Sequence, residues 1–127
     1  MPAHSFSTPL PPRVLVVEDD EAIRGLICQL LVVEGYRVES TATLADARTR
    51  LTDTFDALIV DLELEDGNSD ALLAELAPRL SAPPTLLLSA SPDAIGLARK
   101  YGIAYLSKPF DIDRLMVVLR DATPPNA

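Results

Sequence analysis

The sequence predicts an α/β protein in which five strands of a parallel sheet alternate with five helices. Short aliphatic and β-branched runs recur along the chain without the polar alternation of a half-exposed strand, which is typical of strands covered on both faces. Segments with apolar residues at helical spacing separate these runs. The 127 residues suffice for one domain, and 48% of them are hydrophobic, enough for a sizeable core. This alternation favours a doubly wound sheet with right-handed crossovers.

Three strands and two helices are predicted in the first half of the chain. Residues 14–17 (VLVV) form a buried strand, and the amphipathic helix after it ends before Gly35. Residues 36–40 (YRVES) form a second strand, less buried because charged side chains alternate with apolar ones. The helix over 43–52 opens with a variant of the capping box, and residues 57–60 (ALIV) form the third strand.

The second half continues the pattern. A leucine-rich helix is closed by Pro78, and a buried strand follows at residues 85–88. A helix over 92–102 has a proline in its first turn, where proline is tolerated. Residues 103–106 form the fifth strand, and an aspartate caps a last helix over 111–121.

The sequence predicts a single domain over residues 13–121 with a tail at each end. Residues 1–12 contain four of the eleven prolines and have no hydrophobic period, so we expect a disordered segment. Residues 122–127 (ATPPNA) are expected to be a second tail or the stub of a linker.

Charge and composition exclude several classes of partner. Nineteen acidic and eleven basic side chains give a net charge of −8, which disfavours direct binding of nucleic acid or of anionic membranes. No apolar run is long enough to span a membrane, and the first residues lack the pattern of a secretory signal. The single cysteine, Cys28, fits a reducing compartment. We therefore expect a cytoplasmic protein.

Side chains that can react or bind a ligand follow four of the five predicted strands. Ligands of open parallel sheets bind beyond the carboxyl ends of the strands, so these residues are expected at one edge. They comprise carboxylates, a hydroxyl and an ammonium group: Glu18, Asp19, Asp20, Asp61, Ser89 and Lys108.

This set of groups predicts phosphoryl-transfer chemistry. Converging carboxylates repel each other, and Mg²⁺, which prefers oxygen ligands, relieves that repulsion. A carboxylate beside the metal can attack phosphorus and form an acyl phosphate. The ammonium and hydroxyl groups can then contact the phosphoryl oxygens. Each residue alone also has an ordinary explanation: acids favour the first turn of a helix, and lone serines and lysines are common at the surface.

The chain resembles the receiver domain of two-component response regulators over residues 13–121. The matching motifs are VLVVEDD (14–20), LIVDLEL (58–64), LLLSAS (86–91) and YLSKPF (105–110). Each motif is weak alone, but their order and spacing within an alternating chain are specific. The resemblance implies a flavodoxin-like fold with strand order 2-1-3-4-5.

The resemblance also implies roles for individual residues. Asp61 matches the phosphoacceptor. Glu18 and Asp19 match the acidic pair that holds Mg²⁺, with Asp19 favoured as the direct ligand, and the backbone carbonyl of Glu63 matches a third protein ligand.

A second group of residues is implied to sense the phosphoryl group. Ser89 matches the switch hydroxyl, Lys108 the phosphate-binding lysine, and Tyr105 the aromatic residue that turns inward on activation. A half-buried tyrosine on a strand is the ordinary alternative for Tyr105. The bond before Pro109 falls where the family has a cis peptide.

The loop after the phosphoacceptor departs from the commonest pattern of the family. Glu65 stands where a proline is usual, and Ser69 stands where a glycine often sits. Glu63 and Ser91 occupy positions at which the family tunes hydrolysis of the acyl phosphate, so we expect substitution of Glu63 to change the phosphate half-life.

The function that the resemblance implies is that of a single-domain response regulator. A sensor histidine kinase or phosphotransfer protein would supply the phosphoryl group, and the chain would catalyse only its own phosphorylation and dephosphorylation. The signal would leave through the surface of the fourth helix, fifth strand and fifth helix, to a downstream protein target or a second copy. Val117 and Val118 lie off the inner stripe of the last helix and favour such an interface.

The sequence leaves three alternative functions. The chain could be a phosphorylation-independent interaction module of the same fold, or the receiver fragment of a longer regulator. An aspartate-nucleophile phosphatase of the haloacid-dehalogenase type is disfavoured, because those enzymes need an aspartate two residues after the nucleophile, where this chain has Glu63.

Overall fold

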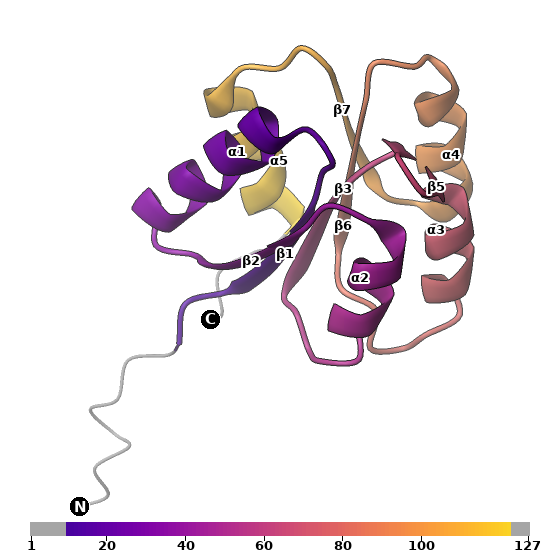
Figure 1. The fold of residues 1–127 in the computed structure, drawn as a ribbon, viewed down its shortest axis with the longest axis horizontal. Coiled ribbons are helices and arrows are strands. Elements are labelled where there is room, and N and C mark those ends of the chain that lie inside the picture. Colours follow the sequence, from indigo (N-terminus) through magenta and orange to yellow (C-terminus); the bar gives the residue numbers. More distant parts are fainter. Residues whose placement is uncertain (1–9, 123–127) are drawn as a thin grey trace, which may run out of the picture.

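The computed structural model describes residues 10–122 as a three-layer α/β/α fold around a parallel five-stranded sheet (Figure 1). The strand order is β2-β1-β3-β6-β7, which confirms the predicted order, since β6 and β7 are the fourth and fifth strands of this sheet. The strands are β1 (Arg13–Val17), β2 (Arg37–Thr41), β3 (Ala57–Asp61), β6 (Thr85–Ser89) and β7 (Ala104–Ser107).

Five helices cover the two faces of the sheet. They are α1 (Glu21–Val33), α2 (Leu44–Arg50), α3 (Asp70–Leu76), α4 (Asp93–Tyr101) and α5 (Ile112–Ala122). Helices α1 and α5 lie on one face, and α2, α3 and α4 lie on the other (Figure 1). None of the helices within residues 10–122 combines the length and the apolar character needed to cross a membrane.

The central strands contribute side chains to two separate cores, because successive side chains of a strand point to opposite faces of the sheet. Leu15 and Val17 of β1 pack on the side of α2, α3 and α4, whereas Val14 and Val16 pack on the side of α1 and α5. All four side chains are fully buried. Burial on both faces explains why this strand has no polar alternation in the sequence.

Local chemistry sets the ends of the helices. The Asp20 carboxylate accepts a hydrogen bond from the Ile23 N–H and caps α1, and Thr43 caps α2 through the Asp46 N–H. At the end of α4, Gly102 adopts the left-handed conformation, with a φ of 63°. The Asp111 carboxylate accepts from the Arg114 N–H at 2.7 Å at the start of α5, as the predicted cap requires.

The structure differs from the sequence-based expectation in a few places. Strands β2 and β7 each begin one residue later than predicted, and α2 ends at Arg50, before the predicted residue 52. A small antiparallel hairpin, β4 (Glu63–Leu64) and β5 (Gly67–Asn68), follows β3 and was not predicted. Two-residue strands carry no hydrophobic period, so nothing in the pattern marks them.

The tails predicted at the two ends fall mostly outside the described residues. Residues 1–9 and 123–127 are not described, and residues 10–12 have no regular secondary structure. Helix α5 includes Ala122, one residue beyond the predicted limit of the domain.

Candidate functional site

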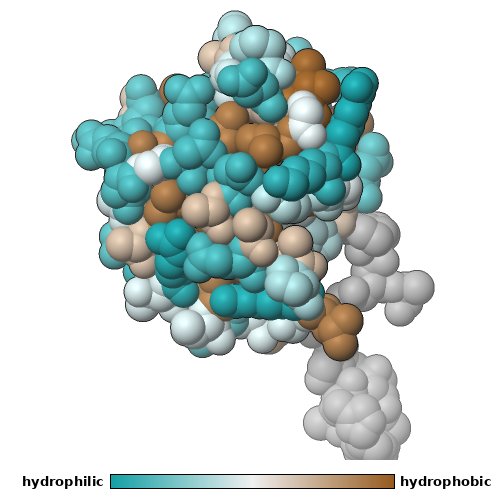
Figure 2. Space-filling view, turned by 90° about the vertical axis from the view of Figure 1, so that its right-hand side faces the viewer, coloured by the Kyte–Doolittle hydropathy of each residue, from teal (hydrophilic) through white to brown (hydrophobic). Residues whose placement is uncertain are grey.

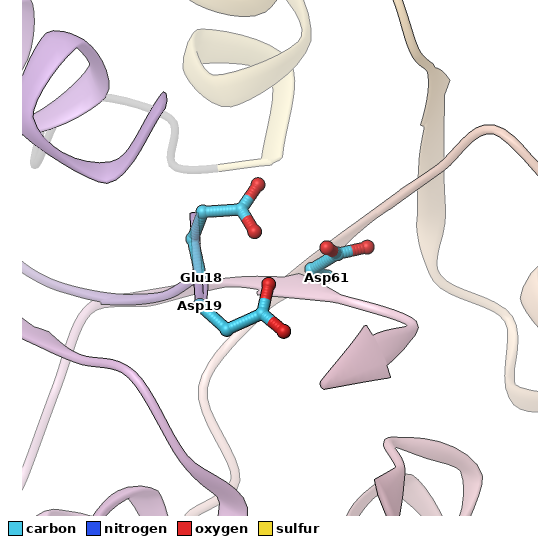
Figure 3. Close-up of side chains that lie close together, drawn as sticks. All are labelled: Glu18, Asp19 and Asp61. Carbon is cyan, nitrogen blue, oxygen red and sulfur yellow. The ribbon is translucent and has the colours of Figure 1, made fainter. Parts of the chain in front are cut away.

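Three carboxylates converge at the carboxyl edge of the sheet. Glu18 and Asp19 directly follow β1, and Asp61 is the last residue of the neighbouring strand β3. One oxygen from each group lies within 4.8 Å of the others, and the side chains point toward a common space (Figure 3). Asp20, the third acid after β1, takes no part because it caps α1.

Two of these acids are buried. Glu18 is 0% exposed, Asp61 is 6% exposed, and Asp19 is half-buried. Burial of charged groups is unfavourable unless they are paired. The Lys108 ammonium group donates to the carboxylates of both Glu18 and Asp61, the second at 2.9 Å. Lys108 is therefore the bridge between two strand ends.

Charge and burial shift the proton affinities in this pocket. The pKa of Glu18 is raised to about 7: burial is the main cause, Lys108 opposes the rise, and the neighbouring Asp61 adds to it. Burial lowers the pKa of Lys108, but hydrogen bonds to Glu18 and Asp61 outweigh that effect, and its net pKa is raised. One ammonium group thus holds two carboxylates that would otherwise repel each other.

Strands β6 and β7 position the remaining predicted residues. The backbone N–H of Lys108 donates to the Ser89 carbonyl at 2.9 Å, and the Lys108–Pro109 peptide bond is cis. The Ser89 side chain is buried at the end of β6, and its hydroxyl accepts from the Ser91 N–H at 2.9 Å. The half-buried Tyr105 donates its hydroxyl to the Ser89 carbonyl at 3.4 Å, so Ser89, Tyr105 and Lys108 form one linked group.

The loop after Asp61 is fixed by a contact that sequence reasoning did not identify. Glu63 is exposed, and its N–H makes a long contact of 3.5 Å with the Asp61 carboxylate. Ser69 is fully buried, and its hydroxyl donates to the Asp61 carbonyl. The replacement of a common glycine was the only sequence signal for Ser69. Arg24 of α1 also contacts the site, donating to the Glu18 carbonyl at 2.9 Å, and no motif marked it.

The donor set fits a hard divalent cation. The pocket offers only carboxylate oxygens as anionic ligands, and one of them belongs to a fully buried glutamate. Three carboxylates against a single ammonium group leave excess negative charge, which a cation would neutralise. The residues therefore match the chemistry of Mg²⁺ better than that of zinc, which favours nitrogen and sulfur ligands.

The sequence of residues 14–120 matches the family model of the response regulator receiver domain. The chain belongs to this family. Receiver domains are the phosphoacceptors of two-component systems; they bind Mg²⁺ through an acidic pocket and interact with histidine kinases or phosphotransfer proteins. The resemblance stated from the motifs and the flavodoxin-like fold are both confirmed.

The curated relatives of this chain are longer regulators. It is similar to the KDP operon transcriptional regulatory protein KdpE of Escherichia coli, with 38% identity over 117 residues, which are 87% of this chain and 50% of KdpE. It is 29% identical to the transcriptional regulatory protein GlrR of the same organism, covering 92% of this chain and 27% of GlrR. The chain thus spans half or less of these relatives.

Solved receiver domains share the fold closely. The non-phosphorylated HemR receiver domain of Leptospira biflexa has a TM-score of 0.82 at 28% identity, and the match covers 91% of this chain and 97% of that one. The signal receiver domain of an HD domain-containing protein from Pseudomonas fluorescens has a TM-score of 0.82 at 29% identity, covering 92% and 90% of the two chains.

Proposed function

We propose that this receiver domain is a phosphoacceptor switch in which Asp61 accepts a phosphoryl group from a sensor histidine kinase or phosphotransfer protein. One observation carries the proposal. A carboxylate at a strand end lies 2.9 Å from a lysine ammonium group and within 4.8 Å of two further carboxylates. A nucleophile, a cation for the phosphoryl oxygens and a metal-binding pair are thus within reach of one point.

The chemical step follows from these positions. A carboxylate oxygen of Asp61 attacks phosphorus and forms the P–O bond of an acyl phosphate, while the P–N bond of the phosphohistidine donor breaks and the imidazole leaves with the electron pair. Lys108, which already bonds Asp61, contacts a phosphoryl oxygen. Glu18, Asp19, Asp61 and the Glu63 carbonyl would hold Mg²⁺, which supplies positive charge to the phosphoryl oxygens. Apart from this self-phosphorylation and its reversal by hydrolysis, we assign the chain no enzymatic activity.

The phosphoryl group would be sensed by the linked group of Ser89, Tyr105 and Lys108. A new dianionic group at Asp61 attracts the Ser89 hydroxyl and the Lys108 ammonium group. Ser89 is the last residue of β6 and Lys108 directly follows β7, and the segments after these strands lead into α4 and α5. Because Tyr105 bonds the Ser89 carbonyl, a shift of Ser89 releases the tyrosine to turn inward.

The output surface is proposed to comprise α4, β7 and α5, and to bind a downstream protein or a second copy of the chain. Ile95 of α4 is 43% exposed and Val117 of α5 is 48% exposed. Val118 packs partly against the core, so the apolar outer side of α5 is narrower than the sequence suggested. Figure 2 looks onto the side that carries α3 and α4, where hydrophobic residues form small patches among hydrophilic ones. Such patches suit a reversible contact.

The proposed surface can be tested separately from the phosphoacceptor chemistry. Val117→Glu should weaken phosphorylation-dependent self-association measured by sedimentation. Val33→Glu is the matched control, because Val33 is an exposed valine on α1, outside the proposed surface. Equal self-association of all three proteins in the phosphorylated state would remove α5 from the proposed interface.

We further propose that residues 13–121 form the functional domain and that the protein acts in the cytoplasm. A receiver that is part of a longer transcriptional regulator is the second candidate. The observation that favours it is the coverage of KdpE, of which this chain matches 50%. A phosphorylation-independent module requires that the pocket not be used, and it is the outcome if the following experiment fails.

The decisive test of phosphoacceptance is the intact mass of the protein after incubation with Mg²⁺ and acetyl phosphate. The wild-type chain should gain one phosphoryl group, whereas Asp61→Asn and a sample with chelator should gain none. Some receivers accept only from their kinase, so beryllofluoride binding provides a second readout. A chain that neither gains mass nor binds beryllofluoride would be the phosphorylation-independent module.

A further inference from the structure

The hairpin that follows the phosphoacceptor is anchored to a helix that carries none of the proposed site residues. Hairpin β4–β5 spans residues 63–68 and departs from the commonest pattern of the family at Glu65, where a proline is usual. A proline would restrict the backbone of this turn. Here the backbone of the turn is restricted by a contact between Asp66 and α2.

Asp66, at the tip of the hairpin, binds the first turn of α2. Its carboxylate oxygens accept from the backbone N–H of Leu44 at 2.9 Å and from that of Ala45 at 3.1 Å. These hydrogen bonds, the one from Leu44 first, lower the pKa of Asp66. Thr43 caps the Asp46 N–H of the same turn. The Thr43 and Asp66 side chains thus accept from three N–H groups at the start of α2. Thr43 directly precedes the helix, whereas Asp66 belongs to the hairpin.

The hairpin backbone also lies close to α2. Gly67 has a φ of 145°, which side-chain-bearing residues rarely adopt, and a Cβ atom there would lie 3.2 Å from the buried Leu44 Cδ1. Asp66 and Gly67 therefore both contact the first turn of α2. We call this contact the Asp66 clasp. It comprises the hydrogen bonds from the Leu44 and Ala45 N–H groups to the Asp66 carboxylate, and the approach of Gly67 to Leu44.

The other end of the hairpin is tied to the strand that carries the phosphoacceptor. The Ser69 hydroxyl donates to the Asp61 carbonyl, and the Ser69 N–H donates to the Leu62 carbonyl at 2.8 Å. Glu63 lies between this attachment and the clasp, and it pairs with Asn68 in the hairpin. The backbone position of Glu63 is therefore defined from both sides.

We propose that Asp66 is a positioning residue for the metal pocket, holding the main chain of Glu63 beside Asp61 through its attachment to α2. This inference rests on the proposed role of the Glu63 carbonyl as a metal ligand. A released hairpin would have to be ordered again when that carbonyl is used, and the ordering entropy would oppose binding. In this chain, the Asp66 clasp restricts the backbone of the turn.

The test measures binding of Mg²⁺ alone by calorimetry, so it needs no phosphoryl donor. Asp66→Asn removes the charge and one of the two acceptor oxygens, and we expect the Mg²⁺ dissociation constant to rise about tenfold, as for residues that orient metal ligands. Glu65→Gln is the matched control: it removes a neighbouring exposed charge from the same turn, and among the described residues Glu65 has no hydrogen-bond partner. Its Mg²⁺ affinity should stay near that of the wild type.

A second control separates positioning from helix stability. Thr43→Ala removes the other cap of α2 without touching the hairpin, so it should lower thermal stability as Asp66→Asn does but leave Mg²⁺ affinity nearly unchanged. Amide exchange gives an independent readout: Asp66→Asn should speed exchange at Glu63 as well as at Leu44 and Ala45.

Two outcomes would overturn the proposal. One is equal Mg²⁺ affinity in Asp66→Asn and the wild type; the other is an equal loss in Asp66→Asn and Glu65→Gln, which would indicate a general charge effect. Failure of the proposed phosphoacceptor function looks different. In that case the wild-type chain would gain no phosphoryl group, while the comparison of Mg²⁺ affinities among the variants would still decide the role of the clasp.

Discussion

The two ends of the sheet use the same types of charged side chain for different purposes. At the amino end of β1, Arg13 pairs with Glu39, and Arg50 bonds the same carboxylate at 2.7 Å. The side chains of this cluster are 25% to 51% exposed, and Arg13 also lies over the Phe55 ring, 4.3 Å from its centre. Water solvates these ion pairs, so they contribute little to the free energy of unfolding.

The carboxyl end has the opposite character. Glu18 is 0% exposed, and Lys108, the cation that bonds it, also serves Asp61. Burial leaves these charges without the solvation that the Arg13 cluster retains. Burial and charge imbalance, rather than the number of ion pairs, therefore distinguish the candidate pocket from the solvated surface cluster.

Removal of Lys108 should have the largest effect on stability. In metal-free protein above pH 7, Lys108→Ala removes the cation that bonds the buried Glu18 and Asp61, so Asp61 loses its ion pair and Glu18 must either stay charged without its partner or take up a proton. We expect the free energy of unfolding to fall by about 3 kcal/mol, as for other broken buried pairs. Urea denaturation with chelator present measures it. A loss no greater than that of Arg50→Ala would contradict the contrast between the two ends.

The pH dependence of stability should follow Glu18. Its pKa is raised from 4.5 to about 7 in the folded protein, so between these values the unfolded chain releases its proton first. The free energy of unfolding of the metal-free protein should therefore decrease as pH rises through this range, by up to about 3 kcal/mol. Glu18→Gln should abolish this decrease and be more stable than the wild type above pH 7. Identical pH profiles for the two proteins would contradict this assignment.

Mg²⁺ should restore part of the stability that the metal-free protein loses as Glu18 ionises. At a free concentration one hundred times its dissociation constant, a ligand specific for the folded state stabilises by about 2.7 kcal/mol. Asp19→Asn should lose most of this gain in thermal denaturation. Asp20→Asn is the control, because Asp20 caps α1 and asparagine is an equally good cap. A similar loss in both variants would place the metal elsewhere.

The smallest effect is expected at the amino end. Arg50→Ala removes one exposed partner of Glu39 and should lower the free energy of unfolding by less than about 1 kcal/mol. The loss should shrink further in high salt, because the pair is exposed to counterions. A large loss that is insensitive to salt would show that this cluster is not the solvated one described above.

The sequence predicted the sheet well because its strands carry an unambiguous signal. The runs at Val14 and Leu86 are buried on both faces, so they lack polar alternation, and their alternation with helices leaves few topologies. Strand ends then placed Glu18, Asp19 and Asp61 together, as the structure finds. Local pattern and topology were sufficient for these features.

The individual hydrogen bonds of these side chains could not be predicted. Three acids follow β1, and their order does not show that Glu18 is buried while Asp20 caps a helix. The contact of Asp66 with α2 and the hydroxyl of Ser69 on the Asp61 carbonyl depend on how the hairpin packs. The strand-end argument placed Lys108 at this edge of the sheet, but its hydrogen bonds to both Glu18 and Asp61 appear only in the structure.

In the proposed function, Asp61 receives the phosphoryl group, and no other acidic side chain of the protein does. The most direct measurement is to phosphorylate the protein with acetyl phosphate and Mg²⁺, reduce the acyl phosphate with borohydride, and locate the resulting homoserine by peptide mass spectrometry. We expect homoserine at position 61 alone, and none when Mg²⁺ is chelated. Homoserine at another acidic position, or a stable phosphoryl adduct that borohydride does not reduce, would contradict it.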